Sequence, residues 1–340
     1  MKKILIISGG DYEQSKEWIV DKILKQSQDG NGLWDNYIFS TDHNQGSFDA
    51  VIKIGRIDTK YEINCNTNNI IALHMEPYLG ATYWHDWMVN GNDECCRIVS
   101  SYMGDKNGNK QIISQACEPW YVEKTYSELK SMDIPTKKFD DKVSWMTSNQ
   151  MALPNHWYRM HFKSYVDKYK PDMFDISGSG IKSIDTKWET IYPYKYVMAI
   201  ENICEPYAWT EKISDVLLGY GLPFYHGCPN ISEDLPEESF IAVDIRNPEQ
   251  AIETMQKAIR DNEWEKRLPA IKEARKRILE QYQFMPYISN LLDEVFEDGE
   301  YKDITIKPHT RSSWVKLQEY YGKCIRRIGK RYWYLKNKFV

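Results

Sequence analysis

The sequence contains no long run of apolar residues. The apolar stretch closest to the N-terminus, residues 4–7, is shorter than the roughly 7–15 residues of a signal-peptide core. It is also far shorter than the roughly 20 residues that span a bilayer. We therefore expect neither a signal peptide nor a transmembrane helix, and the chain shows no internal repeat.

Cysteine is sparse and shows no pairing pattern. The chain has seven cysteines, an odd number, and none of them has the paired spacing of a metal site. Cys95 and Cys96 are adjacent, which is poor geometry for an ordinary disulfide. No Asp-x-Asp metal signature is present either. We expect no bound metal, and the cysteine usage favours a reducing cytoplasm.

The chain also lacks a strong excess of charge. It has 44 Lys and Arg against 49 Asp and Glu, a net charge of −5, with 42% apolar and 27% charged residues. These values exclude a disordered chain, a collagen-like chain and a protein that binds nucleic acid over its whole surface. The balance hides a split, because residues 302–340 carry eleven basic and two acidic side chains, a net of +9. Residues 1–301 therefore carry −14, and such an asymmetry suggests an acidic partner for the tail.

Short apolar runs recur along the chain and are separated by stretches with helical spacing, which predicts parallel β-sheets. The first set of predicted strands covers residues 4–7, 50–54, 69–74, 97–100 and 111–113. The second set covers residues 143–148, 174–176, 196–200, 223–226 and 240–243. Helices of the second half are expected at residues 157–168, 210–218, 248–261 and 264–283.

This pattern predicts two α/β domains joined by the charged stretch 125–142. We place an N-terminal domain at residues 1–130, a C-terminal domain at 131–300 and a basic tail at 301–340. Ligands of open α/β sheets bind beyond the carboxyl ends of the strands, so two facing domains predict a cleft between them.

A dense polar cluster follows the predicted strand 196–200. That strand ends in Glu201 and Asn202, and a helix then opens with Thr210, Glu211 and Lys212. A helix N-terminus favours an anion, and a lysine suits a phosphate. A carboxylate only accepts hydrogen bonds and suits a diol such as a ribose. The same residues also fit a capped helix with a solvated ion pair.

The spacing Tyr-Lys-x4-Ile-Glu-Asn-x7-Thr-Glu-Lys, residues 194–212, resembles the hallmark of glycosyltransferase family 10, the α1,3/4-fucosyltransferases. Further segments resemble that family in the same order. They are Val-Ser-Trp-Met-Thr-Ser-Asn at 143–149 with Arg159 after it, Asp-Ile-Ser-Gly at 175–178, Pro-Phe-Tyr-His-Gly-Cys-Pro at 223–229 and Ser-Phe-Ile-Ala-Val at 239–243. The N-terminal half matches loosely.

The resemblance implies a GT-B fold, in which two Rossmann-like domains face each other and the C-terminal domain binds a nucleotide sugar without an obligatory metal. By analogy, Arg159 and Lys212 hold the diphosphate and Glu211 holds the ribose diol. The other donor-site residues that it implies are Ser148, Asn149, Glu201, Asn202 and Tyr207. The sequence departs from the family at Ile200, Ala208 and His226, which we expect in the donor pocket. GDP-fucose is therefore the expected donor, and another nucleotide sugar remains open.

Inverting transfer also needs a base that deprotonates the acceptor hydroxyl. In the family a glutamate that follows a strand of the N-terminal domain has this role. Here that position points to Glu76, directly after the predicted strand 69–74. We interpret His74 as a core or supporting residue, and Glu118 is a weaker rival for the base.

The tail has apolar and aromatic residues at helical spacing from Trp314 to Leu335, with most of its lysines and arginines between them. Such a basic amphipathic helix is typical of a membrane surface. A helix packed on the acidic body is the alternative, and nucleic acid is not expected as a partner.

Together these observations predict a cytoplasmic enzyme on the inner face of the cell membrane. It would transfer fucose from GDP-fucose to a surface glycan, such as a lipopolysaccharide O-chain or a capsule unit. Two alternatives stay open: the same fold with another donor sugar, and a non-catalytic subunit that binds glycan or nucleotide.

Overall fold

The computed structural model describes residues 1–9, 16–76, 90–115, 117–151 and 154–310. It also describes eight positions of the tail, namely Ser313, Leu317, Tyr320, Tyr321, Cys324, Arg327, Ile328 and Arg331. The predicted tail helix therefore lies largely outside the described residues.

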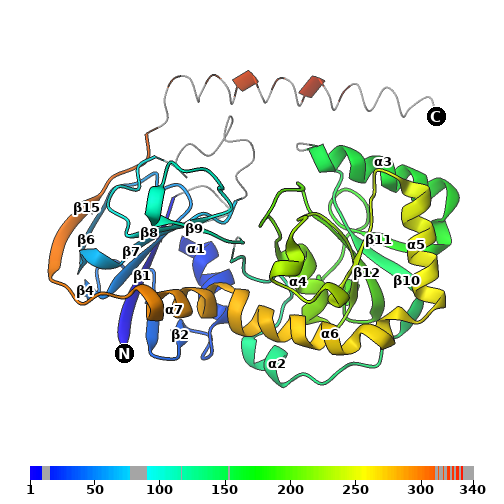
Figure 1. Ribbon diagram of the computed structural model, residues 1–340, viewed down its shortest axis with the longest axis horizontal. Coiled ribbons are helices and arrows are strands. Elements are labelled where there is room, and N and C mark those ends of the chain that lie inside the picture. The colour runs from blue at the N-terminus through cyan, green and yellow to red at the C-terminus, as the bar shows by residue number, and fades with distance from the viewer. Residues whose placement is uncertain are drawn as a thin grey trace.

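The N-terminal domain is built on a seven-stranded sheet (Figure 1). Its order is β2 (Leu33–Trp34), β3 (Tyr37–Ser40), β1 (Lys2–Ser8), β5 (Ala50–Ile54), β7 (Ile70–Leu73), β8 (Arg97–Ser100), β9 (Gln111–Ile113). All pairs are parallel except β2 with β3. Both faces are buried, since Ile4 and Ile6 pack in one cluster while Leu5 and Ile7 pack in another. Burial on both faces explains why these strands are continuous apolar runs.

The C-terminal domain contains a five-stranded parallel sheet. Its order is β11 (Phe174–Ser177), β10 (Phe139–Met146), β12 (Tyr194–Ile200), β13 (Leu222–His226), β14 (Ile241–Ala242). Its helices are α3 (Pro154–Tyr169), α4 (Glu211–Leu218), α5 (Pro248–Arg260) and α6 (Glu263–Arg277), which surround the sheet in Figure 1. The chain leaves β10 toward one edge and later returns beside it as β12. The crevice beyond the ends of these two strands is thus where ligands of such sheets bind.

The observed domain boundaries differ from the predicted ones, because two segments of the chain cross from one domain to the other. Trp120 and Leu129, the latter on α2 (Tyr126–Ser131), pack in the core of the C-terminal domain, so the chain crosses before residue 120. The stretch 125–142 is therefore not a linker. At the other end, α7 (Phe284–Val295) packs Phe284 and Ile288 in the core of the N-terminal domain. Figure 1 shows α6 and α7 along one side of the molecule, beneath both domains.

The start of the tail is a strand and not part of a helix. β15 (Tyr301–Ile306) pairs antiparallel with β6 (Tyr61–Asn66), and β4 (Ser47–Phe48) completes this small sheet. Beyond it, the Nδ1 atom of His309 accepts a hydrogen bond from the Ile57 amide at 2.9 Å. The root of the tail is thereby fixed to the N-terminal domain. None of the helices that the structure describes is long and apolar enough to cross a bilayer.

The remaining helical segments are short. α1 (Lys16–Trp18) continues into a π-helical turn at Ile19–Ile23, and a second π-helical turn at Ile278–Tyr282 joins α6 to the segment before α7.

Candidate functional site

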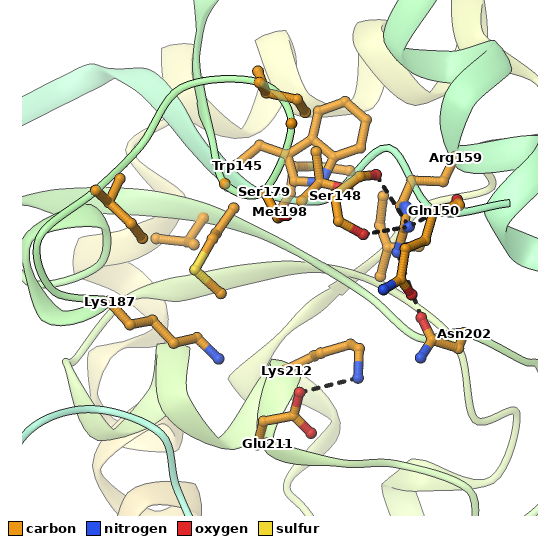
Figure 2. A pocket seen from close by; sticks show the side chains of 18 of the residues that line it. Trp145, Ser148, Gln150, Arg159, Ser179, Lys187, Met198, Asn202, Glu211 and Lys212 are labelled. Atoms are coloured by element: carbon orange, nitrogen blue, oxygen red, sulfur yellow. Dashed lines mark hydrogen bonds and ion pairs between the residues drawn. The ribbon is translucent and has the colours of Figure 1, made fainter. Parts of the chain in front are cut away.

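A cavity of about 700 Å³ opens at the crevice between the ends of β10 and β12. The first turn of α4, one face of α3 and the loop at residues 178–187 complete its wall. Gly178 lets this loop pass close to β10, because its φ is +120° and a Cβ there would lie 2.0 Å from the Thr147 carbonyl oxygen. Figure 2 shows Arg159, Lys187 and Lys212 pointing toward the same cavity from different elements.

Arg159 lies on α3 and is almost fully buried. Its Nη2 donates to the carbonyl and hydroxyl oxygens of Ser148, each at 3.2 Å, and its Nη1 donates to Asn202 Oδ1 at 3.4 Å. Its Nε has no hydrogen-bond partner among the described residues. Burial lowers the pKa of Arg159 to about 10, so the guanidinium stays charged at neutral pH. Among the described residues this fixed, buried cation pairs with no carboxylate, and such a cation suits an anionic ligand.

The first turn of α4 contributes an ion pair, Glu211 and Lys212, to the cavity wall. Lys212 Nζ lies 3.1 Å from Glu211 Oε1 and donates to the Thr210 hydroxyl at 3.0 Å. Burial opposes both charges, yet the charges of Lys212 and Lys187 lower the pKa of Glu211 to about 2. The Glu211 and Glu201 carboxylates hold the pKa of Lys212 above its usual value, although burial opposes this shift. Both side chains are therefore ionised at neutral pH.

Glu201 does not line the cavity, although the sequence places it in the donor pocket. Its carboxylate accepts hydrogen bonds from the Thr210 amide at 2.9 Å and from the Thr210 hydroxyl at 2.7 Å. It also lies 3.6 Å from Lys212 Nζ and is 2% exposed. Thr210 is the N-cap of α4, so Glu201 fastens the start of this helix to the end of β12.

Two other expected donor residues also lie outside the cavity wall. Tyr207 has a left-handed backbone with φ of +59°, and its hydroxyl donates to Glu233 Oε2 at 3.0 Å. The Asn149 side chain packs against Gly180, and the Asn149 backbone amide donates to the Ser179 carbonyl at 3.2 Å. The cavity is lined by five of the residues that the sequence analysis named for the donor site: Ser148, Arg159, Asn202, Glu211 and Lys212.

The structure adds His156 and Lys187 to the cavity. His156 lies one turn before Arg159 on α3, and its Nε2 is 2.9 Å from Asn202 Oδ1. Burial, with the nearby Arg159 charge, lowers the pKa of His156 to about 4, so the neutral ring donates to the Asn202 oxygen. Lys187 reaches the cavity from the loop after β11 and forms a 2.5 Å ion pair with the buried Asp215. The spacing of His156 and Arg159 is a helical signal, whereas nothing in the sequence marks Lys187.

Glu76 follows β7 of the facing domain, and its side chain is exposed. Its carboxylate and that of Glu211 both raise the pKa of Glu118, which lies on the segment that crosses between the domains. His74 is buried, as expected for a core residue. Within the described part of the chain, no group of three or more His, Cys, Asp or Glu is arranged to hold a metal ion.

No protein-family model matches this sequence. A 4-galactosyl-N-acetylglucosaminide 3-alpha-L-fucosyltransferase of Pongo pygmaeus is 26% identical over 184 residues, which are 52% of this chain and 48% of that protein. The match thus spans about half the length of that relative. The chain resembles α1,3-fucosyltransferases.

Solved structures are similar over most of the chain. An α1,3-fucosyltransferase with GDP-fucose is 16% identical and matches 83% of this chain and 92% of its own, with a TM-score of 0.47. An α-glucosyltransferase in complex with UDP-glucose and DNA containing an abasic site is 9% identical and matches 87% of this chain and 100% of its own, with a TM-score of 0.51. The second likeness shows the fold, and the expected GT-B architecture is confirmed.

The buried neutral imidazole of His156 makes stability depend on pH. Its pKa is about 4 in the folded protein and 6.5 in the unfolded chain, so its contribution is complete above pH 6.5 and is lost as pH falls toward 4. We expect the free energy of unfolding in urea to fall less between about pH 7 and about pH 5 in His156→Gln than in wild type, by up to roughly 1.4 kcal/mol per pH unit. If the free energy of unfolding depends on pH equally in the two proteins, His156 is not a buried neutral imidazole.

Proposed function

We propose that the protein is an inverting glycosyltransferase that moves fucose from GDP-fucose to a hydroxyl of a glycan. The observation that carries this proposal is the cluster of Arg159, Lys187 and Lys212 in one cavity at the crevice of the C-terminal sheet. Glu76, on the facing domain, supplies a carboxylate toward the region between the domains. The sequence motif that resembles the fucosyltransferases contributes Asn202, Glu211 and Lys212 to this cavity.

The cavity chemistry suits a nucleoside diphosphate. When the sugar is transferred, the bond between its anomeric carbon and the diphosphate breaks, and the diphosphate gains negative charge. Arg159 and Lys212 are already fixed by hydrogen bonds, so they can stabilise this charge without reorganising. Glu211 is ionised and can accept hydrogen bonds from both hydroxyl groups of a ribose.

Glu76 is proposed as the base. The acceptor oxygen attacks the anomeric carbon from the side opposite the diphosphate, and its proton passes to a carboxylate on that side. Glu76 lies on the domain that faces the donor cavity and is exposed, so an acceptor can reach it. Inversion follows from this single displacement.

The departures from the fucosyltransferase pattern affect the cavity less than the sequence suggests. Ile200 lines it, but His226 does not, since the buried imidazole bonds through Nδ1 to the Val243 carbonyl at 3.0 Å. Ala208 is buried in the loop before α4. Only one of the three changes therefore touches the space proposed for the donor, which supports GDP-fucose over another nucleotide sugar.

We expect GDP to raise the thermal unfolding temperature, and UDP to raise it less, because a bound ligand stabilises the fold by mass action. At 100 times its dissociation constant, GDP would contribute about 2.7 kcal/mol. Lys212→Ala should remove most of this shift. The control is Lys195→Ala, which removes a lysine of β12 that pairs with Glu265 away from the cavity. No shift with GDP, or an equal shift in Lys212→Ala, would contradict the proposed donor site.

The base assignment predicts that Glu76→Gln abolishes fucosyl transfer and leaves GDP binding unchanged. The amide cannot take the proton of the acceptor hydroxyl, whereas the donor site lies on the other domain. Turnover is measured by mass spectrometry of the glycan product, and GDP binding by calorimetry. Near-normal turnover would exclude Glu76 as the base, and turnover lost together with GDP binding would indicate a structural role.

We further propose that the enzyme acts in the cytoplasm, at the inner face of the membrane, on a lipid-linked or surface glycan such as an O-chain or capsule unit. The basic, aromatic sequence of the tail supports this location. Its described apolar residues Leu317, Tyr320 and Ile328 are exposed, which favours a membrane partner over packing on the acidic body.

The tail can be removed without damage to the N-terminal domain if the cut follows Thr310. This position leaves β15 and His309 in place, whereas a cut after Gly299 would strip the partner strand from β6. We expect the truncated protein to lose binding to anionic vesicles, and the full chain to bind neutral vesicles weakly. Added salt should weaken the anionic binding, because it screens charge. Unchanged vesicle binding after truncation would contradict the membrane role.

A further inference from the structure

The segment that carries Glu118 crosses between the two domains and is held rigidly. Cys117 packs in the core of the N-terminal domain and Trp120 packs in the core of the C-terminal domain. The side chain of Gln26 bonds both the amide and the carbonyl of Trp120, at 3.2 and 2.6 Å. Cys117 has a φ of +52°, a conformation that non-glycine residues adopt at a cost. This strained residue directly precedes Glu118, so the Glu118 backbone is held between two residues that are anchored in different cores.

The Glu118 carboxyl is half-buried and has no hydrogen bond or ion pair among the described residues. Together with Thr210 and Ser214 of α4, it lines a small cavity of about 10 Å³, next to the start of that helix. Two nearby carboxylates have hydrogen-bond partners: Glu201 accepts from the Thr210 hydroxyl, and Glu211 accepts from Lys212 Nζ. A ligand hydroxyl that bonds this carboxyl would therefore replace water and would break no hydrogen bond within the protein.

The charges around Glu118 come from both domains. Glu76 follows β7, Glu201 follows β12, and Glu211 and Lys212 stand in the first turn of α4; the charges of all four act on the pKa of Glu118. Burial, then the charges of Glu211 and Glu76, raise the pKa of Glu118 well above its usual value. The raised pKa favours the protonated form of the carboxyl, which can both donate and accept a hydrogen bond. A sugar hydroxyl offers the complementary donor and acceptor.

We propose that the Glu118 carboxyl binds a hydroxyl group of the sugar that lies between Glu76 and Lys212 during transfer. This inference rests on the proposed glycosyltransferase function and adds a sugar-binding residue that is neither the base nor part of the diphosphate site. The hydroxyl belongs either to the donor sugar or to the acceptor sugar. Both offer the same chemistry, and the binding measurements below distinguish them.

The test compares Glu118→Ala and Glu118→Gln with wild type by calorimetry with GDP and with GDP-fucose, and by kinetics with varied acceptor. We expect unchanged GDP affinity in both variants. In Glu118→Ala we expect the affinity for the sugar to fall about tenfold or more, which is the usual cost of removing one strong hydrogen bond. If the donor sugar is bound, the loss falls on the extra affinity of GDP-fucose over GDP. If the acceptor is bound, it appears as a higher KM for the acceptor with unchanged donor affinity.

Glu118→Gln retains a hydrogen-bond donor and an acceptor, and it should fold as wild type does. We therefore expect it to lose less affinity for the sugar than Glu118→Ala loses. The matched control is Glu205→Gln, since Glu205 is also half-buried and lines neither cavity. A merely structural role would change GDP affinity or the unfolding temperature and would spare the sugar-dependent difference. Unchanged GDP-fucose affinity and unchanged acceptor KM in Glu118→Ala would overturn the proposal. Wild-type protein that binds GDP but gains no affinity from the sugar and transfers none would instead contradict the proposed function.

Discussion

The structure of the site depends on the buried carboxylate of Glu201. It bonds the amide and the hydroxyl of Thr210 and lies close to Lys212, so it ties the end of β12 to the first turn of α4. A buried charge is tolerated only where such partners compensate its lost hydration. Because this tie sets where α4 begins, it also sets where Glu211 and Lys212 enter the cavity. Glu201 therefore positions the residues proposed to bind the donor and does not itself face that ligand.

The relation between the two domains is the second constraint, because base and donor site lie on different sheets. Two crossings hold the domains together. The first runs through Cys117 and Trp120, which are anchored in different cores, and the second runs through α7, which returns to the N-terminal domain. Each crossing buries large apolar side chains, so the cleft is shaped by packed elements and not by a flexible linker. Glu118 lies on the first crossing, which makes it the carboxyl most directly placed by the contact between the domains.

The sequence predicted ten of the strands that the structure describes, because a strand buried on both faces must be apolar along its whole length. It missed β2, β3, β4, β6 and β15. It also grouped Arg159, Asn202, Glu211 and Lys212 at one site, and the structure brings these four residues together in one cavity. It predicted no helix at α7, and an apolar helix face would not by itself specify that this helix packs in the core of the N-terminal domain. Lys187 was missed for a related reason: a single lysine in a loop carries no periodic signal, and only the path of the loop brings it to the cavity.

We propose that the cavity that holds Arg159, Lys187 and Lys212 and the carboxylate of Glu76 together perform inverting fucosyl transfer. The most direct test incubates the full chain with GDP-fucose, a panel of other nucleotide sugars and a mixture of glycan acceptors. Products are detected by mass spectrometry, and the anomeric configuration is read by NMR. We expect release of GDP and a fucosylated product whose anomeric configuration is opposite to that of the donor. A product formed from a different nucleotide sugar, or one with retained configuration, would contradict this proposal.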